Sequence, residues 1–158
     1  MNYWHLQMHY PWGPENPDKY IEPSKIVENH LIATSGDNYE NIMCTKMQNG
    51  DIVLVHEGEN PCYVCEIGDL VTDDNLINSL KSEYHHQVYR RITRFCNLEN
   101  FKGDLKYDIR RTLTQINKPN TQKNLKNLIM QAKMSETIEK IKAIALFKKN
   151  IILPLFQK

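Results

Sequence analysis

The sequence predicts an α+β fold, a small mixed β-barrel with short helices inserted early, followed by C-terminal helices. Several short runs alternate between apolar and polar residues, as half-buried strands do, and turns rich in Gly, Pro and Asn separate those runs. From residue 120 onward apolar residues recur instead at steps of three and four among lysines and glutamates, which is typical of amphipathic helix. Five or six short strands with small helices between them favour a compact mixed barrel.

The first third of the chain predicts two strands and two short helices. Residues 3–10 alternate as a strand, with one face formed by Trp4, Leu6, Met8 and Tyr10 and the other by Tyr3, His5, Gln7 and His9. Pro11 ends this strand, because proline cannot donate to the ladder, and "PWGPENPD" is a loop. A short helix follows over 24–30 with Ser24 as its N-cap. "LIATSGDN" then predicts a short strand that breaks into a turn, and a second helix spans 39–47.

The middle of the chain predicts a hairpin and at least one further strand. Two β-rich runs, 51–56 and 62–67, are separated by a polar loop that contains Gly58, Asn60 and Pro61. "HHQVYRRITRF" alternates as another strand, and "DLKYDIRRTLTQI" fits either a strand or a short helix. Near Met134 and Ser135 we expect a break between two C-terminal helices, and Pro154 ends the second. The predicted organisation is a barrel domain over 1–117 and a helical extension over 118–158.

The length and the amino-acid composition limit the class of protein to which this chain can belong. A length of 158 residues with 41% hydrophobic content suits one domain with an appendage. No apolar run approaches the roughly 20 residues of a membrane span, and the first residues lack a signal-peptide block, so we expect a cytoplasmic protein without a membrane partner. Residues 1–80 contain 3 Lys and Arg against 13 Asp and Glu, whereas residues 81–158 contain 17 against 6. This asymmetry predicts a face for a polyanion or an acidic partner, or two halves that attract each other.

The sequence motifs give little support for a metal site or a catalytic site. "CYVC" has the spacing of a zinc site, but strand residues three apart point to opposite faces and cannot coordinate one ion. Cys62 and Cys65 are therefore interpreted as buried thiols. The sequence contains no nucleophile elbow, HExxH or P-loop glycine pattern. His85 and His86 could do acid–base work, but adjacent strand residues face opposite ways, and a solvated strand entry explains them. We therefore expect a binding domain rather than an enzyme, with no cofactor and no metal.

Two groups of residues suit nucleic acid. On a strand, Arg90 and Arg94 share one face and Arg91 lies opposite, and arginine suits phosphate because its guanidinium matches the phosphate oxygens. Lys106 and Arg110 complete this predicted phosphate-binding set, and Lys102 and Arg111 extend the basic patch around it. The alternative is a solvated basic face.

Aromatic rings in a loop form the second group. Tyr10 and Trp12 flank Pro11, where burial is less routine than on a strand, and flat rings beside polar turn groups are what a flipped base needs. The turn "TSGDN" supplies hydroxyls, a carboxylate and an amide. The predicted base pocket contains His9, Tyr10, Trp12, Thr34, Ser35, Asp37 and Asn38. Trp4, in contrast, is expected in the core, and Trp12 could also serve as a hydrophobic lid.

These motifs together resemble a known superfamily. "YWHLQM", "LIATSGDN", "MQNGDIVLVHEGENPCYVCEIGDL" and "YHHQVYRRI" are similar to the PUA-like superfamily, in particular its EVE and YTH branches, over about residues 2–115. The resemblance implies a small barrel that takes a modified base into an aromatic pocket between the first-strand loop and "LIATSGDN". YTH members carry a Trp before the Ser or Thr of that segment, where this chain has Ile32 and Ala33. Either Tyr10 or Trp12 would have to supply the missing ring, or the pocket holds a different base.

The leading hypothesis is a reader of modified DNA, similar to the N-terminal domains of McrBC-type modification-dependent restriction systems. Its partners would be DNA, with RNA less favoured, and a motor or nuclease subunit or domain. Two alternatives stay open: a protein-interaction module that docks through its C-terminal helices, for which "NIILPLF" is an apolar tail that needs a partner, and an RNA-binding accessory domain.

Overall fold

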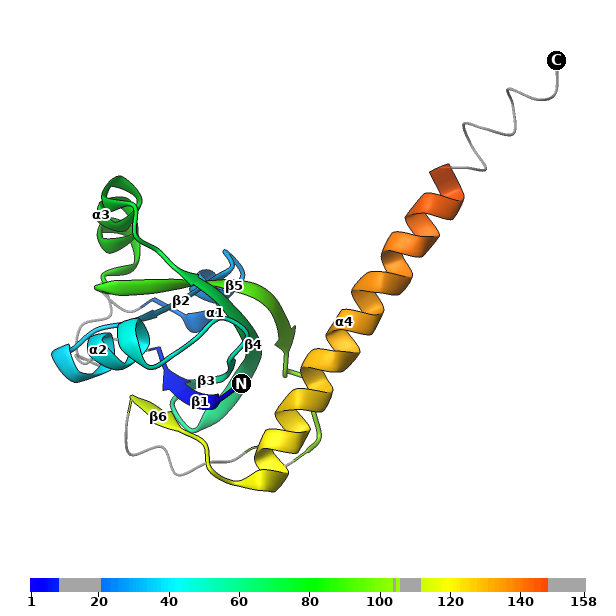
Figure 1. The fold of residues 1–158 in the computed structure, drawn as a ribbon, viewed down its shortest axis with the longest axis horizontal. Coiled ribbons are helices and arrows are strands. Elements are labelled where there is room, and N and C mark those ends of the chain that lie inside the picture. Colours follow the sequence, from blue (N-terminus) through cyan, green and yellow to red (C-terminus); the bar gives the residue numbers. More distant parts are fainter. Residues whose placement is uncertain (9–20, 104, 106–111, 148–158) are drawn as a thin grey trace, which may run out of the picture.

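The computed structural model describes residues 1–8, 21–103, 105 and 112–147. They form an α+β fold in which a six-stranded mixed sheet curls into a half-barrel, and a long helix follows at the C-terminal end (Figure 1). The strands are β1 (Tyr3–Gln7), β2 (Leu31–Thr34), β3 (Ile52–Glu57), β4 (Asn60–Leu70), β5 (Val88–Asn97) and β6 (Leu113–Gln115). The helices are α1 (Pro23–Val27), α2 (Asp37–Thr45), α3 (Asp74–Tyr84) and α4 (Pro119–Phe147).

The strands lie in the order β2-β5-β4-β3-β1-β6. Only β1 and β3 run parallel, and every other neighbouring pair is antiparallel. The predicted hairpin is confirmed, although its second strand is longer and its turn shorter than expected, because Glu57 already pairs with Asn60. Gly58 permits this tight turn with a positive φ of 58°.

Helix α3 is an element that the sequence reasoning did not predict. It begins after Asp73, whose carboxylate accepts a hydrogen bond from the Leu76 N–H at 2.7 Å and so caps the helix. It ends at His85, which takes the left-handed conformation with φ of 62°. The helix therefore turns the chain directly into β5.

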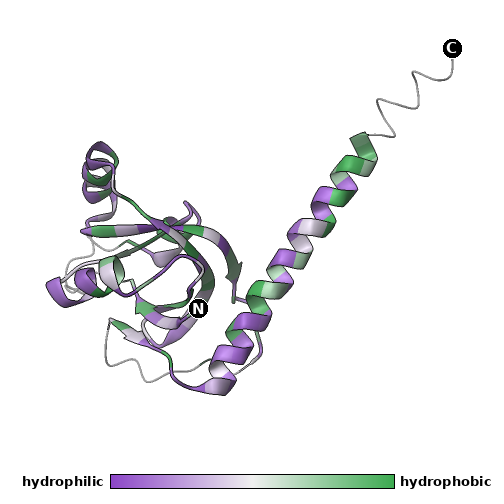
Figure 2. Ribbon diagram, in the orientation of Figure 1, coloured by the Kyte–Doolittle hydropathy of each residue, from purple (hydrophilic) through white to green (hydrophobic). Residues whose placement is uncertain are grey.

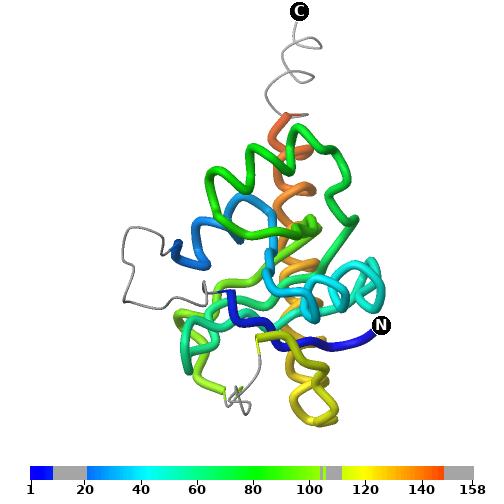
Figure 3. Tube along the Cα trace, turned by 90° about the vertical axis from the view of Figure 1, so that its left-hand side faces the viewer, coloured from blue at the N-terminus to red at the C-terminus, as the bar shows by residue number. Residues whose placement is uncertain are grey.

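Two apolar cores lie on the two faces of the half-barrel. The inner core contains Trp4, Leu6 and Met8, and helices α1, α2 and α3 contribute to it. The outer core joins Ile52, Leu54 and Val64 of the sheet to Leu125 and Ile129 of α4. In Figures 1 and 3, α4 accordingly lies on the opposite side of the sheet from α1 and α2. The prediction that Trp4 belongs to the core is confirmed, because this side chain is 5% exposed.

Over the described residues 119–147 the C-terminal segment is one helix rather than two. The expected break near Met134 and Ser135 was wrong, since α4 runs without interruption through both residues. Serine costs only a fraction of 1 kcal/mol inside a helix, and Lys133 and Glu136 on either side of it are held by ion pairs to the sheet. Pro154 lies outside the described residues.

Candidate nucleic-acid interface

The ends of β1 and β2 meet on the inner side of the half-barrel. Met8, which follows β1, accepts a hydrogen bond through its sulfur from the Ala33 N–H of β2, at 3.2 Å. Both residues are fully buried. The end of the first strand is therefore adjacent to the segment "LIATSGDN", while the loop predicted as the other pocket wall lies outside the described residues.

Polar side chains gather where β2 ends. Thr34 is 1% exposed, and its hydroxyl has no hydrogen-bond partner. The next residue, Ser35, places its hydroxyl oxygen 3.2 Å from Nδ1 of His86, a side chain that is 3% exposed. Which of these two groups donates depends on the tautomer of the imidazole. A buried hydroxyl without a partner costs roughly 1–3 kcal/mol, and among the described residues Thr34 shares this property with the buried ring nitrogens of His56.

Tyr89 fixes the position of His86. Its hydroxyl accepts a hydrogen bond from the His86 N–H at 3.1 Å and donates to the Leu80 carbonyl oxygen at 2.9 Å. Burial raises the pKa of Tyr89 to about 12, so this hydroxyl keeps its proton at neutral pH. The left-handed turn at His85 brings His86 into the protein, which is why the interpretation of His86 as a solvated strand entry was wrong.

Other predicted pocket residues are at the surface or outside the described residues. Asp37 and Asn38 are exposed in the first turn of α2. Gly36 precedes them with φ of 99°, and its N–H donates to the Glu40 carboxylate at 2.9 Å. His9, Tyr10 and Trp12 lie outside the described residues. The structure therefore brings Thr34 and Ser35 together with His86, which the sequence analysis did not assign to the pocket.

Arg90 is buried, and its predicted role as a phosphate ligand was wrong. Its side chain is 5% exposed and donates hydrogen bonds within the protein. The acceptors are the carbonyl oxygens of Gly68, Met43 and Met47 and the side-chain oxygen of Asn49, at 3.1, 2.9, 2.8 and 2.9 Å. The guanidinium thus holds the end of α2 against β4 and β5.

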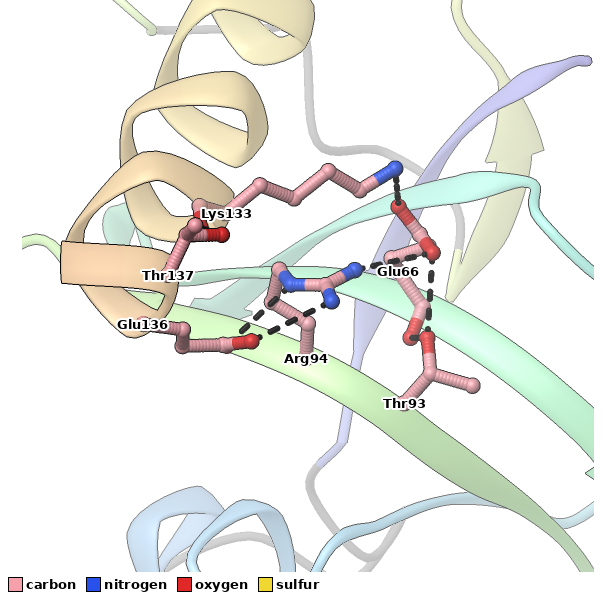
Figure 4. Close-up of polar contacts among 6 residues, drawn as sticks. All are labelled: Glu66, Thr93, Arg94, Lys133, Glu136 and Thr137. Atoms are coloured by element: carbon pink, nitrogen blue, oxygen red, sulfur yellow. Dashed lines mark hydrogen bonds and ion pairs between the residues drawn. The ribbon is translucent and has the colours of Figure 1, made fainter. Parts of the chain in front are cut away.

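Arg94 is engaged in an ionic network between the sheet and α4 (Figure 4). Its guanidinium lies 3.1 Å from Glu66 of β4 and 3.1 Å from Glu136 of α4. Lys133 completes the network, with its ammonium 2.8 Å from the Glu66 carboxylate. Burial alone would raise the pKa of Glu66, but Lys133 and Arg94 outweigh it, and the pKa lies below its usual value. Because two carboxylates already balance Arg94, whose side chain is 19% exposed, its predicted role as a phosphate ligand gains no support from this geometry.

One register shift explains why simple alternation failed on β5. Glu66 pairs with Arg94 and the next residue, Ile67, pairs with Ile92, so β5 holds one extra residue, Thr93, at this point. Such a bulge changes which face the following residues occupy. Ile92 consequently packs in the inner core, while Arg94 reaches α4 on the other side.

The structure describes two of the remaining basic residues of the predicted patch. Arg91 and Lys102 are exposed. Arg91 pairs with Leu31, three residues along β5 from the Val88–Thr34 pair, so it lies about 10 Å from the end of β2. Lys106, Arg110 and Arg111 lie outside the described residues.

A second buried polar pair, His5 and His56, lies on neighbouring strands β1 and β3. Both side chains are 0% exposed, and their rings meet edge to face with centroids 4.4 Å apart. Burial lowers the pKa of His5 to about 4. Burial and the nearby His5 lower the pKa of His56 to about 3. Both imidazoles are therefore neutral at pH 7.

Within the described part of the chain, no three His, Cys, Asp or Glu side chains are grouped so that they could hold a metal ion. Cys65 is buried in the inner core, and Cys62 donates through its sulfur to the Val55 carbonyl oxygen at 3.3 Å. Burial raises the pKa of Cys62 to about 12, so this thiol stays protonated.

Comparisons with protein-family models, with curated proteins and with solved structures gave no match for this chain. Among the helices of the described residues, none is long and apolar enough to cross a membrane.

Proposed function

We propose that the chain is a PUA-like nucleic-acid-binding domain that reads a modified base in DNA, with the base taken up beside the end of β2. The observation that carries the proposal is the buried Thr34 hydroxyl without a partner, next to the Ser35–His86 pair. A hydroxyl kept in a core at a cost to stability is explained if a ligand supplies its missing hydrogen bond.

The side chains near Thr34 support the same proposal. A base edge offers both hydrogen-bond donors and acceptors, and hydroxyl and imidazole groups can satisfy either kind. Tyr10 or Trp12 would supply the stacking ring, and Arg91 would contact a phosphate. As the targeting module of a modification-dependent restriction system, the domain would act with a motor or nuclease subunit.

The sharpest test is the substitution Thr34→Val, which replaces the hydroxyl with a methyl group of similar shape. Because no hydrogen bond is lost in the free protein, the free energy of unfolding should stay the same or rise. Binding of the preferred oligonucleotide should weaken about tenfold, since a polar group of the base loses its partner. Thr45→Val, which removes an exposed hydroxyl at the end of α2, is the matched control. If Thr34→Val lowers stability and leaves binding unchanged, the assignment of Thr34 to the pocket is wrong.

The binding measurement needs a panel of matched oligonucleotides at one salt concentration. The panel contains DNA and RNA, single-stranded and duplex, each unmodified, with N6-methyladenine or with 5-methylcytosine. Trp12→Ala should weaken binding of the preferred oligonucleotide about tenfold, because stacking contributes roughly 1–3 kcal/mol per base. A preference for RNA over matched DNA would favour the accessory-domain alternative.

A further inference from the structure

The turn between α3 and β5 carries His86 into the protein. Helix α3 stands at the end of the sheet where β5 begins, and of its mixed hydrophobic and hydrophilic residues it buries Leu80 and Tyr84 (Figures 1 and 2). His85, which ends α3, has φ of 62°, a left-handed conformation that is costly for a residue other than glycine. Such a conformation persists only where the surrounding contacts outweigh its cost. The contacts that hold this turn therefore determine where the His86 side chain lies.

The hydroxyl group of Tyr89 holds the backbone of His86 on both sides. Its oxygen accepts a hydrogen bond from the His86 N–H at 3.1 Å. Its one proton is shared between the carbonyl oxygens of Leu80 and His86, at 2.9 and 3.1 Å. One side chain thus fixes the two peptide groups that flank the Cα atom from which the His86 imidazole projects, and it joins them to α3 through Leu80.

Tyr89 is itself held firmly in place. Its side chain is 1% exposed and belongs to the inner core. In the sheet Tyr89 lies opposite Ala33 of β2, and its carbonyl oxygen accepts a hydrogen bond from the Val71 N–H at 2.9 Å. Because protein interiors are close-packed, a buried ring on such a strand has little room to move. The sheet therefore sets the position of the hydroxyl, and the turn is anchored to it.

From these contacts we infer that Tyr89 is a positioning residue of the proposed base site, which acts by holding the His86 imidazole against Ser35. The inference rests on the proposed function, because it concerns the same site. Nδ1 of His86 lies 3.2 Å from the Ser35 hydroxyl oxygen, and Ser35 is half-buried, so a ligand can reach it. Tyr89 is too deeply buried to touch the ligand itself. A pair of side chains that is fixed before the base arrives loses less conformational entropy on binding, which strengthens binding.

The substitution Tyr89→Phe keeps the buried ring and removes the hydroxyl alone. The His86 N–H then loses its acceptor, so the turn loosens and the fold loses stability. The matched control is Tyr84→Phe, near the same end of α3. Tyr84 is also buried, with 5% exposed, and its hydroxyl accepts a hydrogen bond from the Asn29 side-chain amide at 2.9 Å. Both variants remove the hydroxyl of a buried tyrosine, but the Tyr84 hydroxyl is bonded to Asn29 rather than to the turn.

The test measures binding and thermal unfolding of the two variants side by side. Both should lower the midpoint of thermal unfolding by similar amounts, about 3 °C, because each loses a buried, hydrogen-bonded hydroxyl. Fluorescence anisotropy with the preferred oligonucleotide of the panel should show binding about fivefold weaker for Tyr89→Phe, since the imidazole is no longer held for the base. Tyr84→Phe should bind like the parent. Equal losses of affinity in the two variants overturn the role of Tyr89.

Two further readouts show whether Tyr89 acts through His86. In NMR spectra of the free protein, Tyr89→Phe should shift the ring signals of His86, whereas Tyr84→Phe should leave them in place; a His86→Ala variant identifies these signals by their absence. In a His86→Ala background, Tyr89→Phe should weaken binding no further, because the group that Tyr89 positions is gone. Unshifted ring signals, or the same loss of affinity from Tyr89→Phe in both backgrounds, would contradict a positioning role.

Two outcomes separate the role of Tyr89 from the proposed function. If Thr34→Val weakens binding while Tyr89→Phe binds like the parent, the base site stands and the role of Tyr89 is wrong. If the parent binds no oligonucleotide of the panel, the proposed function is wrong, and Tyr89 has no base site to position.

Discussion

The buried pair His5 and His56 predicts that the protein loses stability as the pH falls from 7 toward 5. In the folded protein the pKa values of these residues are about 4 and about 3, whereas an unfolded histidine has a pKa of about 6.5. Between these values the unfolded chain binds protons that the folded protein does not. The free energy of unfolding is therefore unaffected above pH 7 and falls as the pH drops below 6.5.

The size of the loss follows from the same pKa values. Each neutral buried histidine costs about 1.4 kcal/mol for every pH unit below 6.5, which amounts to roughly 2 kcal/mol at pH 5. The pair should then cost about 4 kcal/mol, a large fraction of the 5–15 kcal/mol that stabilises a typical domain. Neither ring is exposed, so solvent does not screen the effect.

Urea unfolding followed by circular dichroism from pH 8 to pH 5 measures this loss. His56→Leu should keep the stability of the parent at pH 8, because neither ring nitrogen of His56 has a hydrogen-bond partner, and should halve the loss at pH 5. The control is His30→Asn, an exposed position with φ of 59° that asparagine tolerates. A parent whose stability is the same at pH 8 and pH 5, or a His56→Leu variant with the full loss, would refute the reasoning.

Two further predictions concern buried polar anchors. Arg90→Ala should lower the free energy of unfolding, measured by urea unfolding at pH 7, by about 3 kcal/mol or more, because it leaves several carbonyl oxygens without their donor. The control is Arg91→Ala at the exposed neighbouring position, which should change the free energy of unfolding by less than about 0.5 kcal/mol. Equal effects of the two would contradict the burial of Arg90. Asp51→Ala should cost about 2–4 kcal/mol, because the carboxylate accepts from the Trp4 indole at 2.9 Å and from the backbone N–H groups of Asn2 and Gln48. Trp4→Phe, which removes only the indole donor, should cost less than Asp51→Ala, and the reverse order would contradict this account.

The pattern of residues within a short stretch of sequence predicted those strands that depend on that stretch alone. The hairpin of β3 and β4 was predictable because alternation and turn residues fix it within a short stretch. The burial of Trp4 followed from the same alternation on β1. Helix α3 was missed although its cap at Asp73 is a readable start signal, because Asn, Ser and Lys interrupt its apolar side.

The candidate site was less predictable, because bulges and long-range contacts decide it. Nothing in "VYRRITRF" indicates where β5 shifts its register, and that shift determines the faces on which Ile92 and Arg94 lie. The partners of Arg90 at Met43 and Met47 lie more than 40 positions away in the sequence. His86 enters the site only because α3 ends in a residue with left-handed backbone conformation, His85. A histidine at this position does not by itself predict that conformation.

The burial of Arg90 and the pairing of Arg94 change what the proposed reader should do with salt. Five basic residues at phosphates would give a slope of log K against log [salt] near −4.5, since each phosphate contact contributes about −0.9 on duplex DNA. With these two arginines engaged inside the protein, Arg91, Lys106 and Arg110 would give about −2.7. Fluorescence anisotropy of a preferred duplex between 50 and 200 mM salt measures the slope, and Arg91→Ala should reduce its magnitude by about 0.9. Lys140→Ala, at the far end of α4, should leave it unchanged. A slope as steep as −4.5 would mean that the phosphates follow a basic surface other than β5.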